Sequence, residues 1–224
     1  MRSVALLSGG LDSIVSFTRA AQLTEVALAL TFDYGQRAAA REIAAATAVA
    51  GRAGVVHRVV NLPWLAEITR TALVSREAEL PAPASVAEAG AETAAAVWVP
   101  NRNGVFINIA AAFGEPLGAR LIVAGFNREE AATFPDNSPE FMAAATQALA
   151  LSSQGRPEVI SYTAHLDKVG IVRWGREIGA PLELVWSCYR GEERHCWRCE
   201  SCLRLRRGLI DSGNWDWFLA QRGQ

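Results

Sequence analysis

The sequence predicts an α/β fold, a Rossmann-like parallel sheet with flanking helices, followed by a small helical C-terminal tail that binds zinc. Short runs of Val, Leu and Ile alternate with longer segments of helical character, which is typical of βαβ units with parallel strands. The chain of 224 residues is long enough to bury one large core. Its four cysteines all lie near the C-terminus, between Cys188 and Cys202.

Strand and helix signals alternate through the first half of the chain. Short apolar runs predict strands at Val4–Leu7, Val26–Phe32 and Val55–Val60. The longer segment Asp12–Gln22 and the alanine-rich segment Arg37–Ala50 predict the helices between them. The carboxyl ends of parallel strands meet at one edge of a sheet, so we expect ligands to bind at that edge.

The same alternation continues in the second half of the chain. Helices are predicted at Val105–Phe113, Pro139–Leu151 and Lys168–Ile178, and strands at Leu121–Gly125 and Val159–Tyr162. This pattern completes the α/β layer.

Two segments fall outside this alternation. The segment from Ser75 to Ala96 is rich in Ala, Glu, Pro and Gly, which predicts a loop that serves either as a lid or as a surface insertion. We expect residues 1–185 to form the nucleotide-binding domain and residues 186–224 to form the zinc-binding segment. Trp215 and Trp217 predict a final buried helix, packed on this chain or on another subunit.

Charge and hydropathy exclude several classes of protein. The chain has 22 Lys and Arg against 23 Asp and Glu, so it is no general polyanion binder, and we expect no direct contact with nucleic acid. It shows no signal peptide and no run near the roughly 20 apolar residues of a membrane span, so we expect a cytoplasmic protein without membrane contact. Only one of the basic residues, Lys168, is a lysine.

A glycine-rich hexapeptide, Ser8-Gly9-Gly10-Leu11-Asp12-Ser13, lies between the first predicted strand and the first predicted helix. Unpaired N–H groups at a helix N-terminus attract anions, glycines let the backbone approach a ligand, and serines add hydroxyl donors. These features indicate phosphate binding, and we call residues 8–13 the phosphate loop. The alternative is a structural glycine turn capped by Ser or Asp.

The cysteines have the spacing of metal ligands. Cys188, Cys196, Cys199 and Cys202 are separated by seven, two and two residues. This spacing lets four thiolates converge, so we expect one structural Zn²⁺ per chain that braces the tail. Three alternatives stay open: an iron–sulfur cluster, a sulfur-transferring pair, and His195 in place of one cysteine.

Motifs along the whole chain match one enzyme family. The phosphate loop has the pattern Ser-Gly-Gly-x-Asp-Ser, residues 34–37 read Tyr-Gly-Gln-Arg, residues 99–103 read Val-Pro-Asn-Arg-Asn, and the cysteines lie in a Ser-Cys-Tyr to Ser-Cys signature. In these motifs the chain resembles the QueC family of PP-loop ATP pyrophosphatases, which have an adenine nucleotide alpha hydrolase-like fold. Residues 125–130 stand where common members carry Asn-x-Glu-Asp. Residues 132–138 depart from the family's Ser-Gly-Tyr-Pro-Asp-Cys-Arg.

The resemblance implies a ligase that uses ATP and ammonia to convert 7-carboxy-7-deazaguanine into 7-cyano-7-deazaguanine, through an adenylated intermediate, in queuosine-type deazapurine biosynthesis. It also implies Mg²⁺ bound with ATP, and a homodimer. By the same resemblance, we expect the phosphate loop, Phe32 and Arg37 to bind ATP. We expect Asp12, Arg102 and Lys168 to act in catalysis. Arg102 and Lys168 would stabilise charge on the phosphates or the acyl-adenylate. Alternatively, Arg102 is a loop arginine and Lys168 only begins a helix.

The substrate's guanine-like edge would need a partner in the site. Its adjacent N–H donors suit a carboxylate, and its flat ring suits an aromatic face, so we expect Asp136 and Phe134 to bind it. The alternative is that these residues form only a turn, with Asn137 or Ser138 capping the next helix.

Two other functions stay open on the sequence alone. A PP-loop enzyme that thiolates tRNA would need reactive cysteines and a basic face. A non-catalytic ATP- and zinc-binding module would need no charged set around the phosphates.

Overall fold

The computed structural model describes residues 1–88 and 91–223. Its centre is a five-stranded sheet with the order β3-β2-β1-β4-β5, in which every pairing is parallel. The strands are β1 (Arg2–Leu6), β2 (Glu25–Asp33), β3 (His57–Asn61), β4 (Leu121–Val123) and β5 (Glu158–Ile160). The strand order reverses beside β1, and α/β sheets bind ligands at such a point. The predicted fold class is confirmed.

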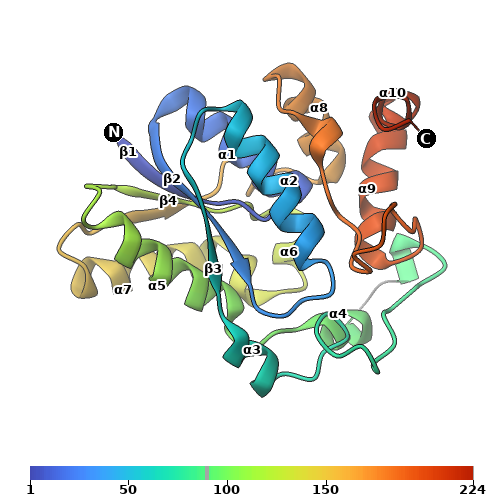
Figure 1. Ribbon diagram of the computed structural model, residues 1–224, viewed down its shortest axis with the longest axis horizontal. Helices are drawn as coiled ribbons and strands as arrows, with labels where there is room; N and C mark the ends of the chain where they lie inside the picture. The colour runs from blue at the N-terminus through green and yellow to red at the C-terminus, as the bar shows by residue number, and fades with distance from the viewer. Residues whose placement is uncertain (89–90, 224) are drawn as a thin grey trace.

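Helices cover both faces of the sheet (Figure 1). One core is shared with α1 (Leu11–Leu23), α2 (Ala39–Arg52) and α8 (Lys168–Glu177), and the other with α5 (Arg102–Gly114) and α7 (Pro139–Ser152). Successive side chains of a strand point to opposite faces, so Ala5 of β1 lies in the first core and Val4 in the second.

The tail packs on the α/β layer. It contains α9 (Glu200–Asp211) and α10 (Trp215–Gln221). The buried side chains of Leu205, Leu209 and Phe218 belong to the core that also holds α1 and α8. The final helix is therefore buried against this chain, and Trp215 packs edge-on against Trp197 with ring centroids 4.9 Å apart.

The segment between β3 and α5 is only partly a loop. It contains α3 (Pro63–Ile68), a 3₁₀ turn η1 (Val86–Glu88) and α4 (Ala91–Val97). The predicted loop from Ser75 to Ala96 is therefore wrong at its C-terminal end, where a run of alanines has high helix propensity. Residues 89–90 of that prediction lie outside the described residues.

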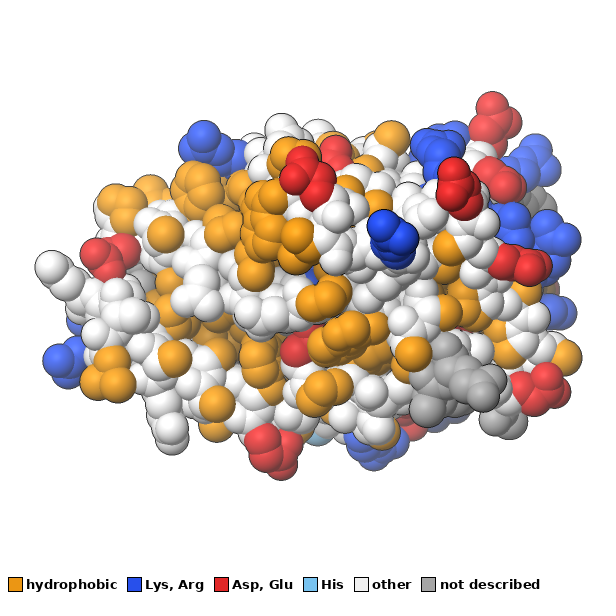
Figure 2. All heavy atoms as spheres, turned by 90° about the horizontal axis from the view of Figure 1, so that it is seen from below, with side chains coloured by type: hydrophobic (Ala, Val, Ile, Leu, Met, Phe, Trp, Pro, Cys, Tyr) orange, Lys and Arg blue, Asp and Glu red, His pale blue; other side chains and the backbone are white. Residues whose placement is uncertain are grey.

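The remaining elements are short. They are α6 (Arg128–Ala131) and the 3₁₀ turns η2 (Pro135–Asn137) and η3 (Leu182–Leu184). Among the helices of residues 1–88 and 91–223, none is long and apolar enough to cross a membrane. Hydrophobic side chains gather across the middle of the face in Figure 2, and basic side chains are most numerous toward the end where the tail lies.

Candidate functional site

A cavity of about 240 Å³ opens at the carboxyl ends of β1, β2 and β4. Its lining combines these strand ends with side chains from α5, α8 and α9, so it lies where the strand order reverses. Most of the residues predicted to act on ATP or the base line it: Ser8, Gly10, Leu11, Asp12, Ser13, Phe32, Arg102, Phe134, Asp136 and Lys168.

The phosphate loop is held open by its own hydrogen bonds. The hydroxyls of Ser8 and Ser13 lie 3.0 Å apart, and Ser13 Oγ donates to the Gly10 carbonyl at 3.0 Å. Gly10 precedes α1, and within residues 1–88 and 91–223 no side chain caps that end of the helix, so its N–H groups are left for an anion. Gly9 has φ +80°, and a Cβ there would lie 2.8 Å from Ala45 Cβ, which requires glycine. This geometry favours anion binding over a capped turn.

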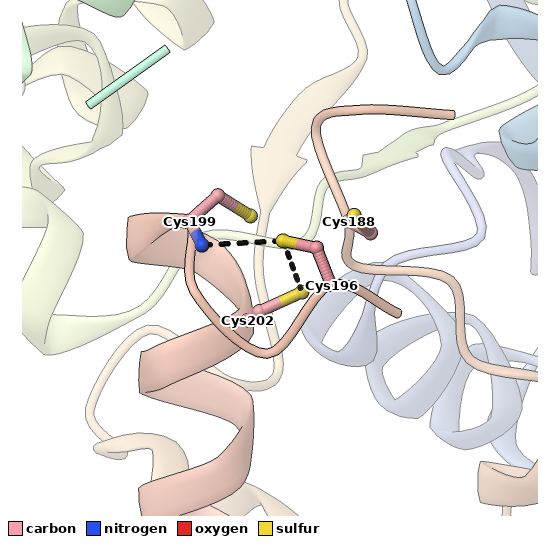
Figure 3. A group of neighbouring side chains, drawn as sticks. All are labelled: Cys188, Cys196, Cys199 and Cys202. Carbon is pink, nitrogen blue, oxygen red and sulfur yellow. Dashed lines mark hydrogen bonds between the residues drawn. The ribbon is translucent and has the colours of Figure 1, made fainter. Parts of the chain in front are cut away.

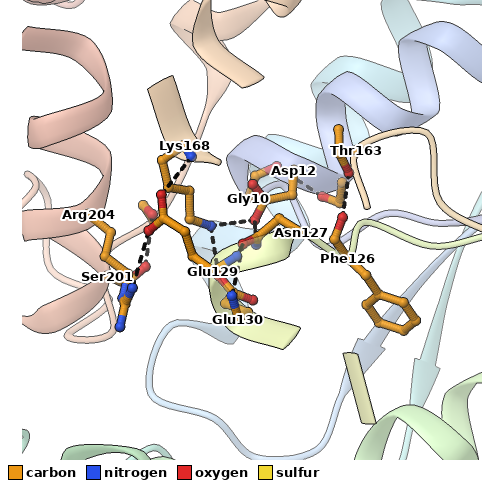
Figure 4. A network of polar contacts seen from close by, with 12 residues as sticks. Gly10, Asp12, Phe126, Asn127, Glu129, Glu130, Thr163, Lys168, Ser201 and Arg204 are labelled. Carbon is orange, nitrogen blue, oxygen red and sulfur yellow. Dashed lines mark hydrogen bonds and ion pairs between the residues drawn. The ribbon is translucent and has the colours of Figure 1, made fainter. Parts of the chain in front are cut away.

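Lys168 forms the centre of a buried charge cluster (Figure 4). Its Nζ lies 2.5 Å from Asp12 Oδ2 and 2.7 Å from Glu130 Oε1. Asn127 Nδ2 also donates to Asp12 Oδ2, at 3.2 Å. Among the residues that the structure describes, Asp12 Oδ1 is buried and has no hydrogen-bond partner. The structure therefore brings together two residues predicted as catalytic, and it adds Glu130 and Asn127.

The pKa values in this cluster reflect burial and mutual attraction. Burial raises the pKa of Asp12 to about 6, although Lys168 acts in the opposite direction. Burial would lower the pKa of Lys168, but the charges of Asp12 and Glu130 outweigh it and raise that pKa above its usual range. Burial alone would raise the pKa of Glu130, but the charge of Lys168 outweighs burial and lowers that pKa overall. The ammonium is thus firmly charged.

Two elements outside the phosphate loop fix the backbone of Lys168. Its N–H donates to Glu129 Oε1 at 2.9 Å, and Glu129 also pairs with Arg204 at 3.3 Å and with Arg207. A Cβ on Gly208 of α9 would lie 3.0 Å from the Lys168 carbonyl oxygen. The tail therefore contacts the lysine of the cavity directly.

Arg102 and Asp136 line the cavity from the start of α5 and from η2. Arg102 Nη1 donates to Tyr34 Oη at 3.0 Å. Burial would lower the pKa of Arg102, but Tyr34 and Asp136 raise it overall. Asp136 accepts from Asn137 Nδ2 at 3.0 Å, and burial raises its pKa against the charge of Arg102. Arg102 is thus no isolated surface arginine.

The turn interpretation of residues 134–138 is confirmed, and base binding by Phe134 and Asp136 stays a prediction. Residues Pro135–Asn137 form η2, and Ser138 caps α7 by accepting from Phe141 N at 3.1 Å. Phe134 and Asp136 still line the cavity. The same segment therefore forms a turn and lines the cavity.

Two residues predicted to bind ATP do not line this cavity. The Gly9 carbonyl accepts from Trp186 N at 2.8 Å, which ties the phosphate loop to the tail, and a role of Gly9 in ATP binding stays a prediction. Arg37 donates to the carbonyls of Ser75 and Ala78, so it anchors the segment before α4. Its role in ATP binding stays a prediction.

The four cysteines form a compact sulfur cluster at the start of α9 (Figure 3). Their sulfurs lie within 4.8 Å of one another, and the Cys196 and Cys202 sulfurs are 3.9 Å apart. Tetrahedral zinc with bonds of about 2.3 Å separates its sulfurs by about 3.8 Å, so the donor set fits such an ion. His195 lies outside this cluster, because its Nε2 accepts from Ser187 N at 3.2 Å and its ring packs on Trp186 and Trp197. Replacement of a cysteine by His195 is therefore not supported.

Comparison with protein families matches residues 2–213 to the family described as "Queuosine biosynthesis protein QueC". The chain belongs to the QueC family. A QueC-family relative from Pelotomaculum thermopropionicum is 56% identical, over 95% of this chain and 98% of its own length. One from Methanosarcina barkeri is 45% identical over 100% of both chains. Both relatives are named 7-cyano-7-deazaguanine synthase.

Solved structures support the fold of this QueC chain. A structure described as a 4-thiouridine synthetase–RNA complex with bound ATP has a TM-score of 0.51 and 18% identity, and the match covers 98% of this chain and 53% of that one. At this identity the likeness concerns the fold alone. The relatives' names favour neither a tRNA-thiolating enzyme nor a non-catalytic module.

Proposed function

We propose that this QueC-family chain is a 7-cyano-7-deazaguanine synthase, a ligase of queuosine-type deazapurine biosynthesis. The observation that carries the proposal is near-full-length similarity, at 56% and 45% identity, to relatives of that name. The cavity adds chemical support, since one space joins a phosphate loop, a buried lysine and a carboxylate beside an aromatic ring.

The reaction needs two activations. The carboxylate of 7-carboxy-7-deazaguanine attacks the α-phosphate of ATP, which forms the acyl-adenylate and releases pyrophosphate. Ammonia displaces AMP and gives the amide, with loss of one proton. The amide oxygen attacks a second ATP, and pyrophosphate leaves. Departure of that oxygen with AMP and loss of both N–H protons of the amide leave the nitrile.

The phosphate loop is the anchor for the phosphates in this proposal. Its free helix N-terminus and serine hydroxyls suit the leaving pyrophosphate, and Lys168 and Arg102 offset negative charge as it develops. Mg²⁺ would neutralise phosphate oxygens, and the unpartnered Asp12 Oδ1 is an oxygen that could hold it. Phe32 lines the cavity beside the strand end of β2 and supplies an apolar wall for the nucleotide.

Asp136 and Phe134 are the proposed base-binding residues. A carboxylate has about four acceptor sites, and Asp136 uses one toward Asn137 and one toward Asn103 N, at 3.4 Å. Two sites are left for the adjacent N–H donors of a guanine-like edge.

The remaining assignments complete the proposal. Residues 1–185 act as the nucleotide-binding unit, and residues 186–224 hold one structural Zn²⁺ on the four cysteines. As whole residues, Cys188, Cys199 and Cys202 are at most 1% exposed, which suits structural ligands better than a sulfur relay. The enzyme acts as a homodimer on small molecules.

The test is a product assay. The wild-type chain is incubated with ATP, ammonium and 7-carboxy-7-deazaguanine, and AMP and the nitrile are measured by mass spectrometry. We expect both products, with two AMP per nitrile. Absence of carboxylate-dependent AMP would favour a binding module, and AMP without nitrile would indicate another acceptor.

A further inference from the structure

Trp98 is a large aromatic side chain that faces the cavity. Its neighbours Val97 and Val99 are 5% and 2% exposed and belong to the second core. Trp98 lies between them, partly exposed, and lines the cavity. Within the described residues it is part of neither core that flanks the sheet. The two valines therefore fix the backbone while the indole is turned toward the site.

The ring of Trp98 is parallel to that of Phe134. The two planes differ by 5°, and the ring centroids are 6.1 Å apart. Stacked carbon atoms make contact at about 3.5 to 4 Å, so the two parallel rings are not in full face-to-face contact. Phe134 is fixed as well, because its N–H donates to the Glu130 carbonyl at 2.7 Å.

We propose that Trp98, which sequence motifs did not indicate, forms with Phe134 an aromatic clamp for the flat base of the substrate. The inference rests on the proposed function for the identity of that base, and it adds a specificity-determining residue to the site. The ligand class is a planar, guanine-like heterocycle. Its ring stacks on the parallel faces while its donor edge meets Asp136.

Three features of the cavity support a flat polar ligand here. The aromatic faces are parallel, a buried carboxylate lies two residues after Phe134, and Arg102 stands beside that carboxylate in charge contact with it. Sites for small molecules combine apolar walls with a few placed polar groups in this way. Trp98 also links the site to α4, which ends at Val97.

The test measures binding of 7-carboxy-7-deazaguanine by calorimetry without ATP, and KM for the same compound and for ATP in turnover. The variants are Trp98→Leu, which keeps apolar bulk but lacks a flat face, and Trp98→Phe, which keeps one. The matched control is Trp64→Ala on α3, where the side chain is 41% exposed. Thermal melting reports folding of each variant.

We expect Trp98→Leu to weaken binding of the base roughly tenfold or more, with KM for ATP within about twofold of wild type. Trp98→Phe should restore most of the affinity, and Trp64→Ala should bind as wild type. Unchanged affinity in Trp98→Leu, or an equal rise in both KM values, would overturn the clamp. If the wild type binds the base but forms no AMP, the proposed function fails, while the dependence of binding on Trp98 still decides the inference.

Discussion

At the scale of single residues, the buried ammonium of Lys168 lies between the carboxylates of Asp12 and Glu130. The cluster of Asp12, Glu130 and Lys168 sums to one negative charge in a cavity that is proposed to receive polyphosphate. That surplus is reasonable only if a cation accompanies the ligand, and Asp12 Oδ1 is the oxygen without a partner. The two carboxylates therefore hold the ammonium of Lys168 in place at the cavity.

Lys168→Met should lower AMP formation by about 10²- to 10³-fold, because it removes a positioned positive charge beside the developing phosphate charge. The measurement is carboxylate-dependent ATP–pyrophosphate exchange. Glu177→Gln is the control, since Glu177 is exposed on the same helix α8. Exchange at the wild-type rate in Lys168→Met would show that Lys168 is only structural.

The pH dependence of stability should report Asp12. Its pKa rises from the ordinary 3.8 to about 6 in the folded protein, so its contribution stabilises the fold below pH 4 and is lost as pH rises through 6. Asp12→Asn does not titrate. Its free energy of unfolding relative to wild type should therefore increase between pH 4 and pH 7, by up to about 3 kcal/mol. Urea denaturation at several pH values measures this.

The control for Asp12 is the exposed Asp216, changed to Asn. A difference between Asp12→Asn and wild type that stays constant with pH would contradict the raised pKa. Both Asn variants should fold, and only Asp12→Asn should lose activity.

Sequence patterns identified the charged residues of the site better than their partners. Asp12 and Lys168 were predicted from a motif and from the rarity of lysine, and the structure places them in contact. The sequence did not indicate Glu129, Glu130 and Trp98, because their partners are distant in the chain. Glu129 contacts α9, and Trp98 faces Phe134. Among these partners, Asn127 is the one that a local pattern could have indicated, because asparagine is a common N-cap residue and Asn127 caps α6.

At the scale of elements, apolar periodicity located the strands and long helices because burial on one face determines them. It gave no bounds for α9 within the tail that was predicted to be helical, because the sequence of α9 is rich in arginine and its buried side chains pack on α8 and α1. It also placed the start of α5 three residues late, at Val105, because Asn101 begins the helix from a left-handed conformation with φ 52°. The exact residues at which such helices begin and end depend on tertiary contacts, which apolar periodicity does not report.

The contact of α9 with α8 gives a prediction for an element. Gly208→Ala places a Cβ 3.0 Å from the Lys168 carbonyl oxygen, so α9 or Lys168 must shift. We expect kcat to fall about tenfold or more, with a change in the free energy of unfolding of no more than about 2 kcal/mol. Enzyme kinetics and urea denaturation measure the two quantities.

Gly51→Ala in α2 is the control for that substitution. Gly51 is also helical, but a Cβ there meets nothing within 4 Å, so the variant should gain up to about 1 kcal/mol of stability and keep full activity. Loss of stability without loss of kcat in Gly208→Ala would mean that α9 supports the fold and does not position the lysine.

At the scale of the whole molecule, the tail contacts the site at two places. Trp186 N donates to the Gly9 carbonyl in the phosphate loop, at 2.8 Å. The arginines of α9 hold Glu129, which accepts the Lys168 N–H. Cys199 and Cys202 lie at the start of the same helix, so the sulfur cluster fixes the end of α9 nearest the cavity.

Removal of the metal should therefore affect catalysis as well as stability. Wild-type protein should contain about one zinc per chain by elemental analysis, and Cys202→Ser should contain less and unfold with a free energy lower by more than about 3 kcal/mol. Chelation should also lower ATP–pyrophosphate exchange, and added Zn²⁺ should restore it, because α9 then holds Lys168 again. Ser212→Ala, beyond the end of α9, is the control. Full ATP–pyrophosphate exchange in a folded, metal-free protein would show that the tail does not position Lys168. Visible absorption together with bound iron would show that the cysteines hold an iron–sulfur cluster and not zinc.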